Sequence, residues 1–372
     1  MRPNLAFVDL AALRHNTRLF QKKALDAMIM AVVKADAYGH GAIPVSEAAL
    51  QGGAAWLGVA TAGEALQLRD AGIEAPVLVI GALMPEEFLG LIERNISLPL
   101  TQMGHILPLA AAAQACQKKA KVHIKAETGF HRLGIPLARM SETLEVLAQN
   151  PWLELEGLYT HFAQADDIDD GFVDSQYAVF LSAEDLARQR GFDPIIHVCN
   201  SAAALRRPEL HRDMVRIGIS LYGCRPDLQT PDYMEDLRQV MSWKTAIAAI
   251  SPLKEGETVG YSRAYTADGE KTIATLPLGY GDGYRRCMGE KAHVLIRGQK
   301  CPVLGRICMD HTMVDITGLG AEIGDEVVLL GKQGREEITV NQMAVWQNSV
   351  PHEVTLAISP RVPRVFADDR EG

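Results

Sequence analysis

The sequence of 372 residues is poor in the features that mark secreted, membrane-spanning or metal-binding chains. It has six cysteines, and no two of them form a Cys-x-x-Cys pair, which argues against a disulfide framework and a structural zinc site. No apolar run is long enough to span a membrane, and the first ten residues lack the apolar core of a signal peptide. We therefore expect a cytoplasmic protein with reduced thiols and no metal.

An excess of positive charge is also absent. Lys and Arg number 37 against 46 Asp and Glu, so the formal net charge at pH 7 is −9. A chain of this sign is a poor match for nucleic acid or an anionic membrane surface. Its 48% apolar and 22% charged residues are typical of a folded globular protein, and its length suits one large domain with a smaller second one.

Eight short apolar runs alternate with helical patterns in the first part of the chain. They are nearly continuous, which is typical of parallel strands buried on both faces. The runs lie at 28–33, 55–60, 76–80, 96–100, 121–124, 155–160, 195–199 and 214–219. This is the count of a (β/α)₈ TIM barrel, which we predict. A doubly wound sheet also fits, because counting strands does not show closure.

The pattern changes after residue 235. Strand-like segments separated by turn signals follow one another at 243–250, 271–278, 292–297, 312–316 and 326–330. The last turn signal is 331–334, and the next helical pattern is 340–348. We therefore predict an α/β barrel domain over 1–236 and a mainly β C-terminal domain over 237–372. Residues 1–9 are a candidate to pair with the β domain.

Polar residues follow the predicted barrel strands at the ends where this fold places active sites. They are Lys34, Lys125, His161, Ser201 and Arg216. A lysine at a strand end is usually a solvated charge, but one that is desolvated has a lowered pKa and can form a Schiff base with a carbonyl. Arg216 lies in an apolar strand and needs a partner, either an internal salt bridge or a bound ligand.

A second feature of these strand ends is a potential phosphate site. Asn200 and Ser201 begin a helix after the seventh predicted strand, and Gly218 ends the eighth, which is where barrels commonly bind phosphate. A plain N-cap serine is the competing interpretation of Ser201. A reactive lysine together with a phosphate cradle indicates pyridoxal 5′-phosphate, whose ring is an electron sink.

Nine separated motifs carry a more specific resemblance. In chain order they are VKADAYGHG (33–41), KAETGFHRLG (125–134), THFA (160–163), NSAA (200–203), VRIGI (215–219), VGYS (259–262), LGYGDG (278–283), GRICMD (305–310) and RVPR (361–364). The set, in this order, resembles the bacterial alanine racemases, which are fold type III pyridoxal-phosphate enzymes.

The resemblance implies a two-base mechanism. Lys34 would bind pyridoxal 5′-phosphate and act as the base on the D-side of the substrate, and Tyr261 would be the base on the L-side. Two bases are needed because one side chain does not reach both faces of a planar carbanion. The resemblance also implies a homodimer in which Tyr261 and Met309 serve the partner subunit's site.

The same resemblance implies the other site residues. Arg216 would lie against the pyridine nitrogen, supported by His161, and the phosphate would be bound by Tyr38, Ser201, Gly218 and Ile219. The substrate carboxylate would be held by Arg132 and by the backbone N–H of Met309. Lys125 matches a position that is often carbamylated, and Tyr280 and Asp310 would shape the entrance.

The chain departs from the family's usual pattern at a few positions. Glu127 and Phe130 stand where aspartate and methionine are frequent. Pro360 precedes the RVPR motif where some members carry a tyrosine that touches the cofactor phosphate. Without this tyrosine, the sequence does not predict how strictly the site selects alanine over serine.

The implied function is the interconversion of L-alanine and D-alanine, which supplies D-alanine for peptidoglycan or for catabolism. A serine or broad-specificity racemase is the nearest alternative. A pyridoxal-phosphate decarboxylase of basic amino acids shares the two-domain plan but carries Cys-Asp-Gly where this chain has Cys308-Met-Asp310. A non-catalytic carrier of the cofactor needs no second base such as Tyr261.

Overall fold

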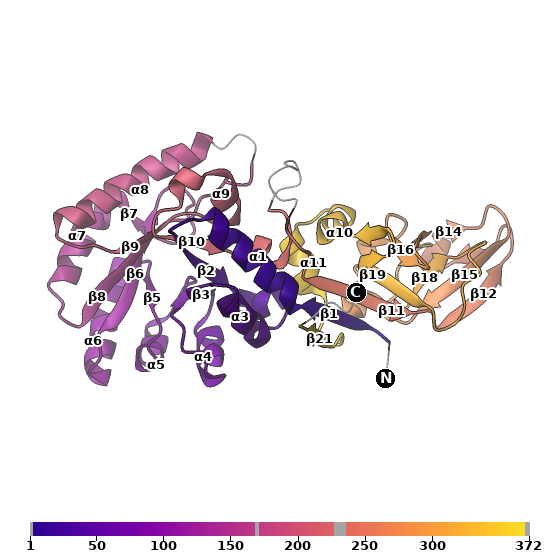
Figure 1. The fold of residues 1–372 in the computed structure, drawn as a ribbon, viewed down its shortest axis with the longest axis horizontal. Coiled ribbons are helices and arrows are strands. Elements are labelled where there is room, and N and C mark those ends of the chain that lie inside the picture. Colours follow the sequence, from indigo (N-terminus) through magenta and orange to yellow (C-terminus); the bar gives the residue numbers. More distant parts are fainter. Residues whose placement is uncertain (1–2, 168–170, 227–235, 369–372) are drawn as a thin grey trace.

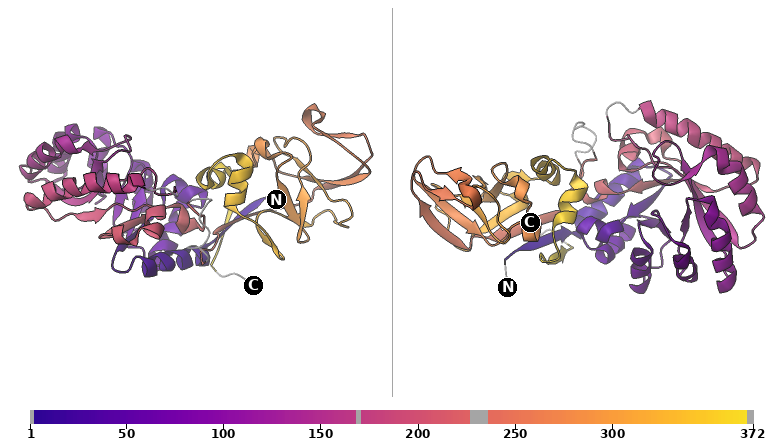
Figure 2. Two further views of the ribbon diagram at one scale, coloured as in Figure 1. Left: turned by 90° about the horizontal axis from the view of Figure 1, so that it is seen from above. Right: turned by 180° about the vertical axis from the view of Figure 1, so that it is seen from behind.

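The computed structural model describes residues 3–167, 171–226 and 236–368. It has two parts, a ring of strands and helices and an elongated region of sheets, which lie end to end in Figures 1 and 2. None of the described helices is long and apolar enough to cross a bilayer.

Eight parallel strands form the first part. They are β2 (Met28–Val32), β3 (Trp56–Val59), β4 (Val77–Val79), β5 (Leu98–Leu100), β6 (Ala120–Glu127), β8 (Leu153–Tyr159), β9 (Ile195–His197) and β10 (Met214–Ile217). Two parallel sheets run in the orders β10-β2-β3-β4 and β5-β6-β8-β9. A parallel bridge between Leu78 and Ser97 links β4 to β5, and the Arg216 amide donates to the Cys199 carbonyl at 3.0 Å beside β9 and β10. The ring therefore closes, and the barrel prediction is confirmed.

Helices follow the strands around the outside of the barrel (Figure 1). They are α1 (Leu10–Lys23), α3 (Ala42–Gln51), α4 (Ala62–Asp70), α5 (Phe88–Glu93), α6 (Ile106–Cys116), α7 (Leu137–Ala148), α8 (Gly171–Gln189) and α9 (Ser201–Arg206). Local sequence explains two of them well. A capping box between Thr61 and Glu64 begins α4, and α7 buries Met140, Leu144 and Leu147 along one face.

The second part is built from three sheets. Its strands are β1 (Leu5–Asp9), β11 (Met241–Ala246), β12 (Ala249–Leu253), β13 (Thr258–Val259), β14 (Tyr265–Thr266), β15 (Lys271–Leu276), β16 (His293–Ile296), β17 (Gln299–Pro302), β18 (Thr312–Asp315), β19 (Glu326–Gln333), β20 (Glu336–Ile338) and β21 (Arg364–Ala367). The largest sheet has the order β17-β16-β19-β11-β1-β21, with β20 paired to β19. The helices α10 (Val340–Gln347) and α11 (Pro351–Ala357) lie between this sheet and the barrel (Figure 1).

The N-terminal strand belongs to this sheet and not to the barrel. Strand β1 runs antiparallel to β11 and parallel to β21. The predicted domain boundary between residues 236 and 237 adjoins a segment outside the described residues and stays a prediction.

One predicted strand and one predicted turn in this part differ in detail from the structure. The segment predicted as one strand at 243–250 is divided between β11 and β12, which belong to different sheets. An apolar run does not show where a chain leaves one sheet for another. Of the turn predicted at 331–334, only Gly334 lies in a turn; Gly331 lies inside β19, where a Cβ would stand 2.8 Å from the Cβ of Ser242 on the neighbouring strand. Gly331 allows two strands to approach closely. In the sequence, a glycine needed for this reason looks the same as a glycine needed for a turn.

Candidate active site

A cavity of about 480 Å³ lies at the mouth of the barrel, beyond the carboxyl ends of its strands. The structure brings nine of the predicted site residues together around it. They are Lys34, Tyr38, Lys125, Arg132, His161, Ser201, Arg216, Gly218 and Ile219. They come from several different strands, as expected for a barrel active site.

Lys34 begins an unusual turn. The segment labelled α2 (Lys34–Gly39) has φ between 51° and 55° at four successive residues, Ala35 to Tyr38, which is a turn of left-handed helix. Each such residue other than glycine costs about 1–2 kcal/mol, so the surroundings must hold the turn. Glu64 accepts a hydrogen bond from the Ala35 amide at 2.6 Å, and Asp36 accepts one from the Ala42 amide at 2.7 Å. The turn brings the Tyr38 ring to 6.0 Å from the Lys34 ammonium.

Both cavity lysines have lowered pKa values. Burial and the charge of Arg132 lower the pKa of Lys34. Burial, followed by the charges of Arg132 and Arg216, lowers the pKa of Lys125 to about 8. Each amine is therefore more often neutral, and thus nucleophilic, than a lysine in water.

Arg216 lies on the floor of the cavity, where it is buried to 3% exposure. Its Nη1 donates to the carbonyl of His197 at 2.6 Å and to Nδ1 of that ring at 3.2 Å. Its Nη2 donates to the Thr160 carbonyl at 2.7 Å and approaches Nδ1 of His161 at 3.3 Å. No carboxylate pairs with it among the described residues, so carbonyls and imidazoles hold it in place of an internal salt bridge. Burial lowers its pKa to about 10, and it remains a cation at neutral pH.

His161 is surrounded by positive charge. Burial, followed by the charges of Arg216, Arg132, Lys125 and Lys34, holds its pKa well below the usual range. The ring is therefore neutral near pH 7. A neutral Nδ1 can accept the hydrogen bond from Arg216, so His161 supports the guanidinium as the resemblance implies.

A small cradle forms where α9 meets the end of β10. The Gly218 amide donates to the Ser201 hydroxyl at 2.9 Å, and a Cβ at position 218 would lie 2.7 Å from the Tyr38 hydroxyl. Only a glycine allows these groups to converge. The N-cap of α9 is Asn200, whose side chain accepts from the Ala203 amide at 3.0 Å, so Ser201 is not the N-cap. Its hydroxyl is directed toward the end of β10.

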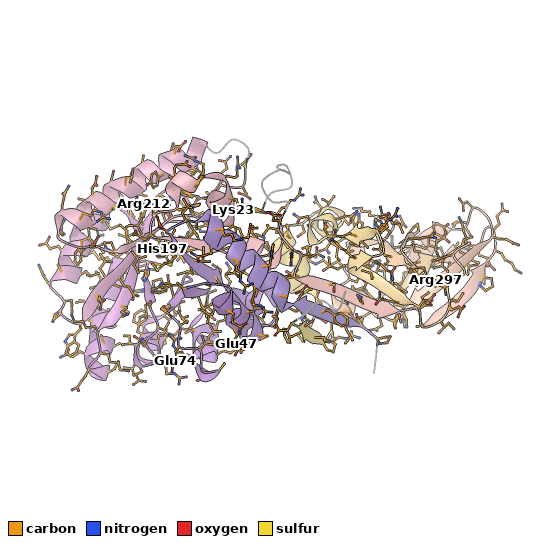
Figure 3. The ribbon with its side chains drawn as sticks, viewed as in Figure 1. Lys23, Glu47, Glu74, His197, Arg212 and Arg297 are labelled. Carbon is orange, nitrogen blue, oxygen red and sulfur yellow. The ribbon has the colours of Figure 1, made fainter. Side chains whose placement is uncertain are left out.

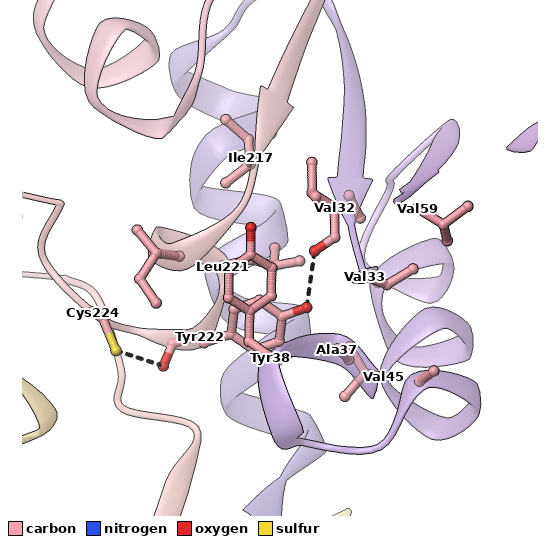
Figure 4. Close-up of a cluster of buried hydrophobic side chains, with 14 of the residues drawn as sticks. Val32, Val33, Ala37, Tyr38, Val45, Val59, Ile217, Leu221, Tyr222 and Cys224 are labelled. Carbon is pink, nitrogen blue, oxygen red and sulfur yellow. Dashed lines mark hydrogen bonds between the residues drawn. The ribbon is translucent and has the colours of Figure 1, made fainter. Parts of the chain in front are cut away.

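Tyr38 is held against the barrel by a second tyrosine. Its ring lies 4.9 Å from that of Tyr222, whose hydroxyl donates to the Val32 carbonyl at 3.0 Å (Figure 4). This contact joins the left-handed turn to the end of β2. The phenol of Tyr38 therefore has a fixed position beside Gly218.

Arg132 lies at the side of the cavity on an aromatic platform. Its guanidinium is 4.2 Å from the centre of the Phe130 ring, and that ring packs edge-to-face with His161 at 5.5 Å between ring centres. A cation over an aromatic face is attracted by the ring's quadrupole. Phe130 thus fixes the direction of Arg132 toward the cavity.

Tyr159 and His352 are polar cavity residues that reasoning from the sequence did not find. Tyr159, at the end of β8, lines the cavity, and its buried hydroxyl has no partner among the described residues. His352 reaches the cavity from α11 and lies 5.7 Å from the Tyr38 ring. Burial and the charge of Lys34 lower its pKa. The only sequence signal at His352 is Pro351, which starts its helix, and a helix start does not show what the helix faces.

Pro360 is one of the positions at which the sequence departs from the usual pattern of the family that it resembles. Pro360 does not line this cavity but a separate hollow, together with Asp36 and Arg364. The residue that reaches the cavity from this part of the chain is His352, eight positions earlier. A turn separates α11 from the RVPR motif and directs Pro360 away from the barrel mouth.

Four predicted site residues lie outside the cavity. Tyr261, Tyr280 and Met309 are on the β domain with exposures of 65%, 41% and 52%, and Asp310 is also exposed. The backbone segments that carry Tyr280 and Met309 are hydrogen-bonded to each other. The Tyr280 amide donates to the Cys308 carbonyl at 3.0 Å, and the Gly281 amide donates to the Met309 carbonyl at 2.9 Å. Asp310 accepts from Arg361 at 2.7 Å. Within one chain the structure does not bring these residues to Lys34.

The fold and the cavity define an enzyme of barrel-plus-sheet architecture, with amines, guanidinium groups and a hydroxyl cradle at the barrel mouth. Comparisons with known proteins agree. Residues 8–226 match the family "Alanine racemase, N-terminal domain", and residues 240–366 match "Alanine racemase, C-terminal domain". The chain therefore belongs to the alanine racemase family, and it is an amino-acid racemase, an isomerase.

Relatives match over almost the whole chain. An alanine racemase of Symbiobacterium thermophilum is 38% identical over 371 residues, which is 99% of this chain and 98% of the relative. The structure of an alanine racemase from Streptomyces coelicolor A3(2) is 36% identical with a TM-score of 0.94, covering 99% of this chain and 98% of that one. Another, from Bacillus anthracis with bound L-Ala-P, is 35% identical with a TM-score of 0.93, covering 99% and 96%.

Proposed function

We propose that this protein interconverts L-alanine and D-alanine with pyridoxal 5′-phosphate, in a homodimer whose sites combine residues of both subunits. The observation that carries the proposal is the convergence of Lys34, Arg216 and the cradle of Tyr38, Ser201 and Gly218 on one cavity. The relatives above are alanine racemases, which supports alanine as the substrate.

The cavity residues fit this cofactor. The cradle beside Gly218 has room for an anion only because position 218 carries no side chain, and it offers the hydroxyls of Tyr38 and Ser201. Lys34 would hold the aldehyde carbon, and Ile219 would add a backbone contact to the phosphate. When bound, the cofactor withdraws electrons from the substrate's Cα and so acidifies its proton.

Arg216 would limit how far the ring of a bound cofactor accepts electrons. Its guanidinium is a cation held by carbonyls, so it would disfavour protonation of a pyridine nitrogen beside it. A weaker electron sink suppresses side reactions such as transamination. His161 supports this arrangement because it stays neutral.

Proton transfer requires one base on each face of the substrate. The Lys34 amine has a lowered pKa and would take or return the proton on the D-side. Tyr261 would do so on the L-side from the second subunit. Its 65% exposure in the single chain and its distance from the cavity lining support a role across an interface.

The substrate's carboxylate would be held by Arg132 and by the backbone N–H of Met309 from the second subunit. Arg132 is fixed over Phe130, and Lys125 lies near it. Lys125 would act as a carbamate, formed from its neutral amine and CO₂ with loss of a proton. The resulting anion can pair with Arg132. Tyr280 and Asp310 would shape the entrance between the subunits.

Chiral chromatography tests the reaction and its specificity. The protein is incubated with pyridoxal phosphate and, separately, L-alanine, L-serine or L-lysine. Dominant formation of D-alanine is expected, and Lys34→Ala should abolish it. Equal conversion of serine would instead make the protein a broad-specificity racemase, and absence of any D-product from cofactor-loaded protein would refute the proposal.

Mixing two inactive variants tests the shared site. In a heterodimer of Lys34→Ala and Tyr261→Phe, one site has neither base and the other has both. Random exchange of an equal mixture should therefore restore about one quarter of wild-type activity. Tyr265→Phe, four residues further on, serves as the matched control and should stay active alone. If Tyr261 served its own subunit, mixing would restore nothing.

A further inference from the structure

The interior of the barrel is unusual because one half of it is polar. Met30, Trp56, Leu78 and Met214 form a small apolar cluster in the other half. Opposite them, the buried rings of His123 and His197 lie in the barrel, and Figure 3 shows His197 among the strands. Barrel interiors are normally filled by branched apolar side chains, so a second polar layer below the cavity needs an explanation.

These polar groups form one continuous chain of hydrogen bonds. Nη1 of Arg216 is 3.2 Å from Nδ1 of His197, and Nε2 of His197 is 2.9 Å from Nδ1 of His123. Nε2 of His123 is 3.1 Å from a carboxylate oxygen of Glu156. Glu156 also accepts from Ser97 and pairs with Lys121 at 2.9 Å. The chain therefore runs from the cavity to the opposite end of the barrel.

Donors and acceptors fix the direction of every bond in this chain. A guanidinium only donates, so Nδ1 of His197 is an acceptor and its proton is on Nε2. His197 then donates to Nδ1 of His123, whose own proton must also be on Nε2. His123 in turn donates to Glu156. Both rings are neutral, with a cation at one end and an anion at the other.

The electrostatics agree with this assignment. Burial, with the charge of Arg216 adding to it, lowers the pKa values of His197 and His123. Burial alone would raise the pKa of Glu156, but hydrogen bonds from His123, Ser97 and Lys121 lower it to about 2. Glu156 is therefore an anion, and the two rings are uncharged, throughout the physiological range.

The backbone conformation of β8 places Glu156 and His123 within hydrogen-bonding distance. The register of β6 against β8 shifts between Val122 and His123, which leaves Glu156 as an extra residue in a β-bulge of β8. Bulges redirect side chains, and this one supplies the carboxylate. At the next residue, Gly157, a Cβ would stand 2.0 Å from Nδ1 of His123. The Tyr159 ring stacks on His197 at 4.8 Å and 6°.

We propose that Glu156, through the fixed tautomers of His123 and His197, is a positioning residue for Arg216. The inference rests on the proposed function, in which Arg216 contacts the cofactor. If Glu156 did not accept from His123, both rings could reverse, and Nδ1–H of His197 would then face the N–H groups of Arg216. The guanidinium would lose one of the contacts that orient it on the cavity floor, and the N–H groups facing it would push it from its place.

The first test reads the tautomers and needs neither cofactor nor substrate. Protein labelled with ¹⁵N-histidine is studied by long-range ¹H–¹⁵N NMR at pH 6–8, with His123→Gln and His197→Gln used for assignment. We expect both rings to be neutral with the proton on Nε2. A proton on Nδ1 of His197, or a charged ring at either position, would overturn the proposal.

The second test is a double-mutant cycle with Arg216. Glu156→Gln should lower kcat for alanine about 10-fold in the wild-type background and change KM less than about twofold. In an Arg216→Lys background the same change should cost less than about twofold, because the residue it acts through is already altered. Glu154→Gln, on the same strand but outside the chain of hydrogen bonds, should leave kcat unchanged.

A purely structural role for Glu156 would give equal losses in the two backgrounds and would refute the proposal, as would an unchanged kcat. If Glu156→Gln does not fold, Ser97→Ala removes one donor to the carboxylate and should show the same non-additivity at smaller size. The two proposals fail separately. A protein that racemises no amino acid loses the proposed function, while the NMR result still decides the tautomers.

Discussion

Gly157→Ala should destabilise the barrel strongly. The new methyl group would stand 2.0 Å from Nδ1, 2.4 Å from Cε1 and 2.7 Å from Cγ of His123. Carbon atoms of this kind do not approach closer than about 3 Å, so the ring must retreat by about 1 Å. A ring displaced this far loses its bonds to His197 and Glu156, which are 2.9 and 3.1 Å long.

The size of the effect follows from these two bonds. Leaving a buried donor or acceptor unsatisfied costs about 1–3 kcal/mol for each group. Alanine regains about 0.5–1 kcal/mol relative to glycine in a strand. The net loss is therefore about 1–5 kcal/mol in the free energy of unfolding. For a domain of this size, where 1 kcal/mol corresponds to about 2–4 °C, it should lower the barrel's Tm by about 2–20 °C.

Calorimetry and urea unfolding monitored by circular dichroism measure this loss. Gly90→Ala is the control, since Gly90 lies in α5 with nothing within 4 Å of its added Cβ. It should be neutral or stabilising by up to about 1 kcal/mol. If Gly157→Ala unfolded within about 0.5 kcal/mol of the wild type, His123 would be free to move, and the close packing inferred for it would be wrong.

Three further predictions concern the site. Because the pKa of Lys125 is lowered to about 8, its carbamate signal from ¹³C-bicarbonate in NMR should grow between pH 7 and 9 and vanish in Lys125→Arg. Phe130→Leu removes the platform of Arg132, so KM for alanine should rise about 2- to 5-fold with kcat nearly unchanged, and Phe130→Tyr should restore it; a kcat effect alone would contradict this. The lowered pKa of Glu156 contributes stability above its ordinary pKa that is lost as the pH falls toward 2. Urea midpoints of wild type and Glu156→Gln should therefore differ most above about pH 5 and converge in acid, and a constant difference would contradict the assignment.

The barrel could be predicted from the sequence because parallel strands buried on both faces leave continuous apolar runs. All eight runs overlap barrel strands. Closure could not be predicted, since it depends on pairings such as that between Leu78 and Ser97, which no local pattern encodes. The same limit explains the strand at 243–250, where the chain crosses between sheets without a break in its apolar pattern.

The cavity could be anticipated because residues at the ends of parallel strands meet at one edge. Lys34, Lys125, His161, Ser201, Arg216 and the end of the last strand at Gly218 were found in this way, and the resemblance added Tyr38 and Arg132. The polar layer beneath could not be found from one sequence. His123 and His197 each look like an isolated histidine in an apolar strand, and the bulge that directs Glu156 inward has no sequence signature.

The place of β1 in the large sheet bears on how this chain is made. Leu5 pairs with Lys244, and the same strand pairs on its other side with β21. Strand β1 must therefore wait until more than half of the printed chain has followed it before either neighbour is synthesised, whereas most barrel strands pair with a strand that follows closely in the sequence. During this interval β1 exposes unpaired backbone groups that can bind another nascent chain. Expression yield should therefore be sensitive to changes in residues 5–9, in addition to the stability of the finished enzyme, in which Ala6 and Val8 are fully buried.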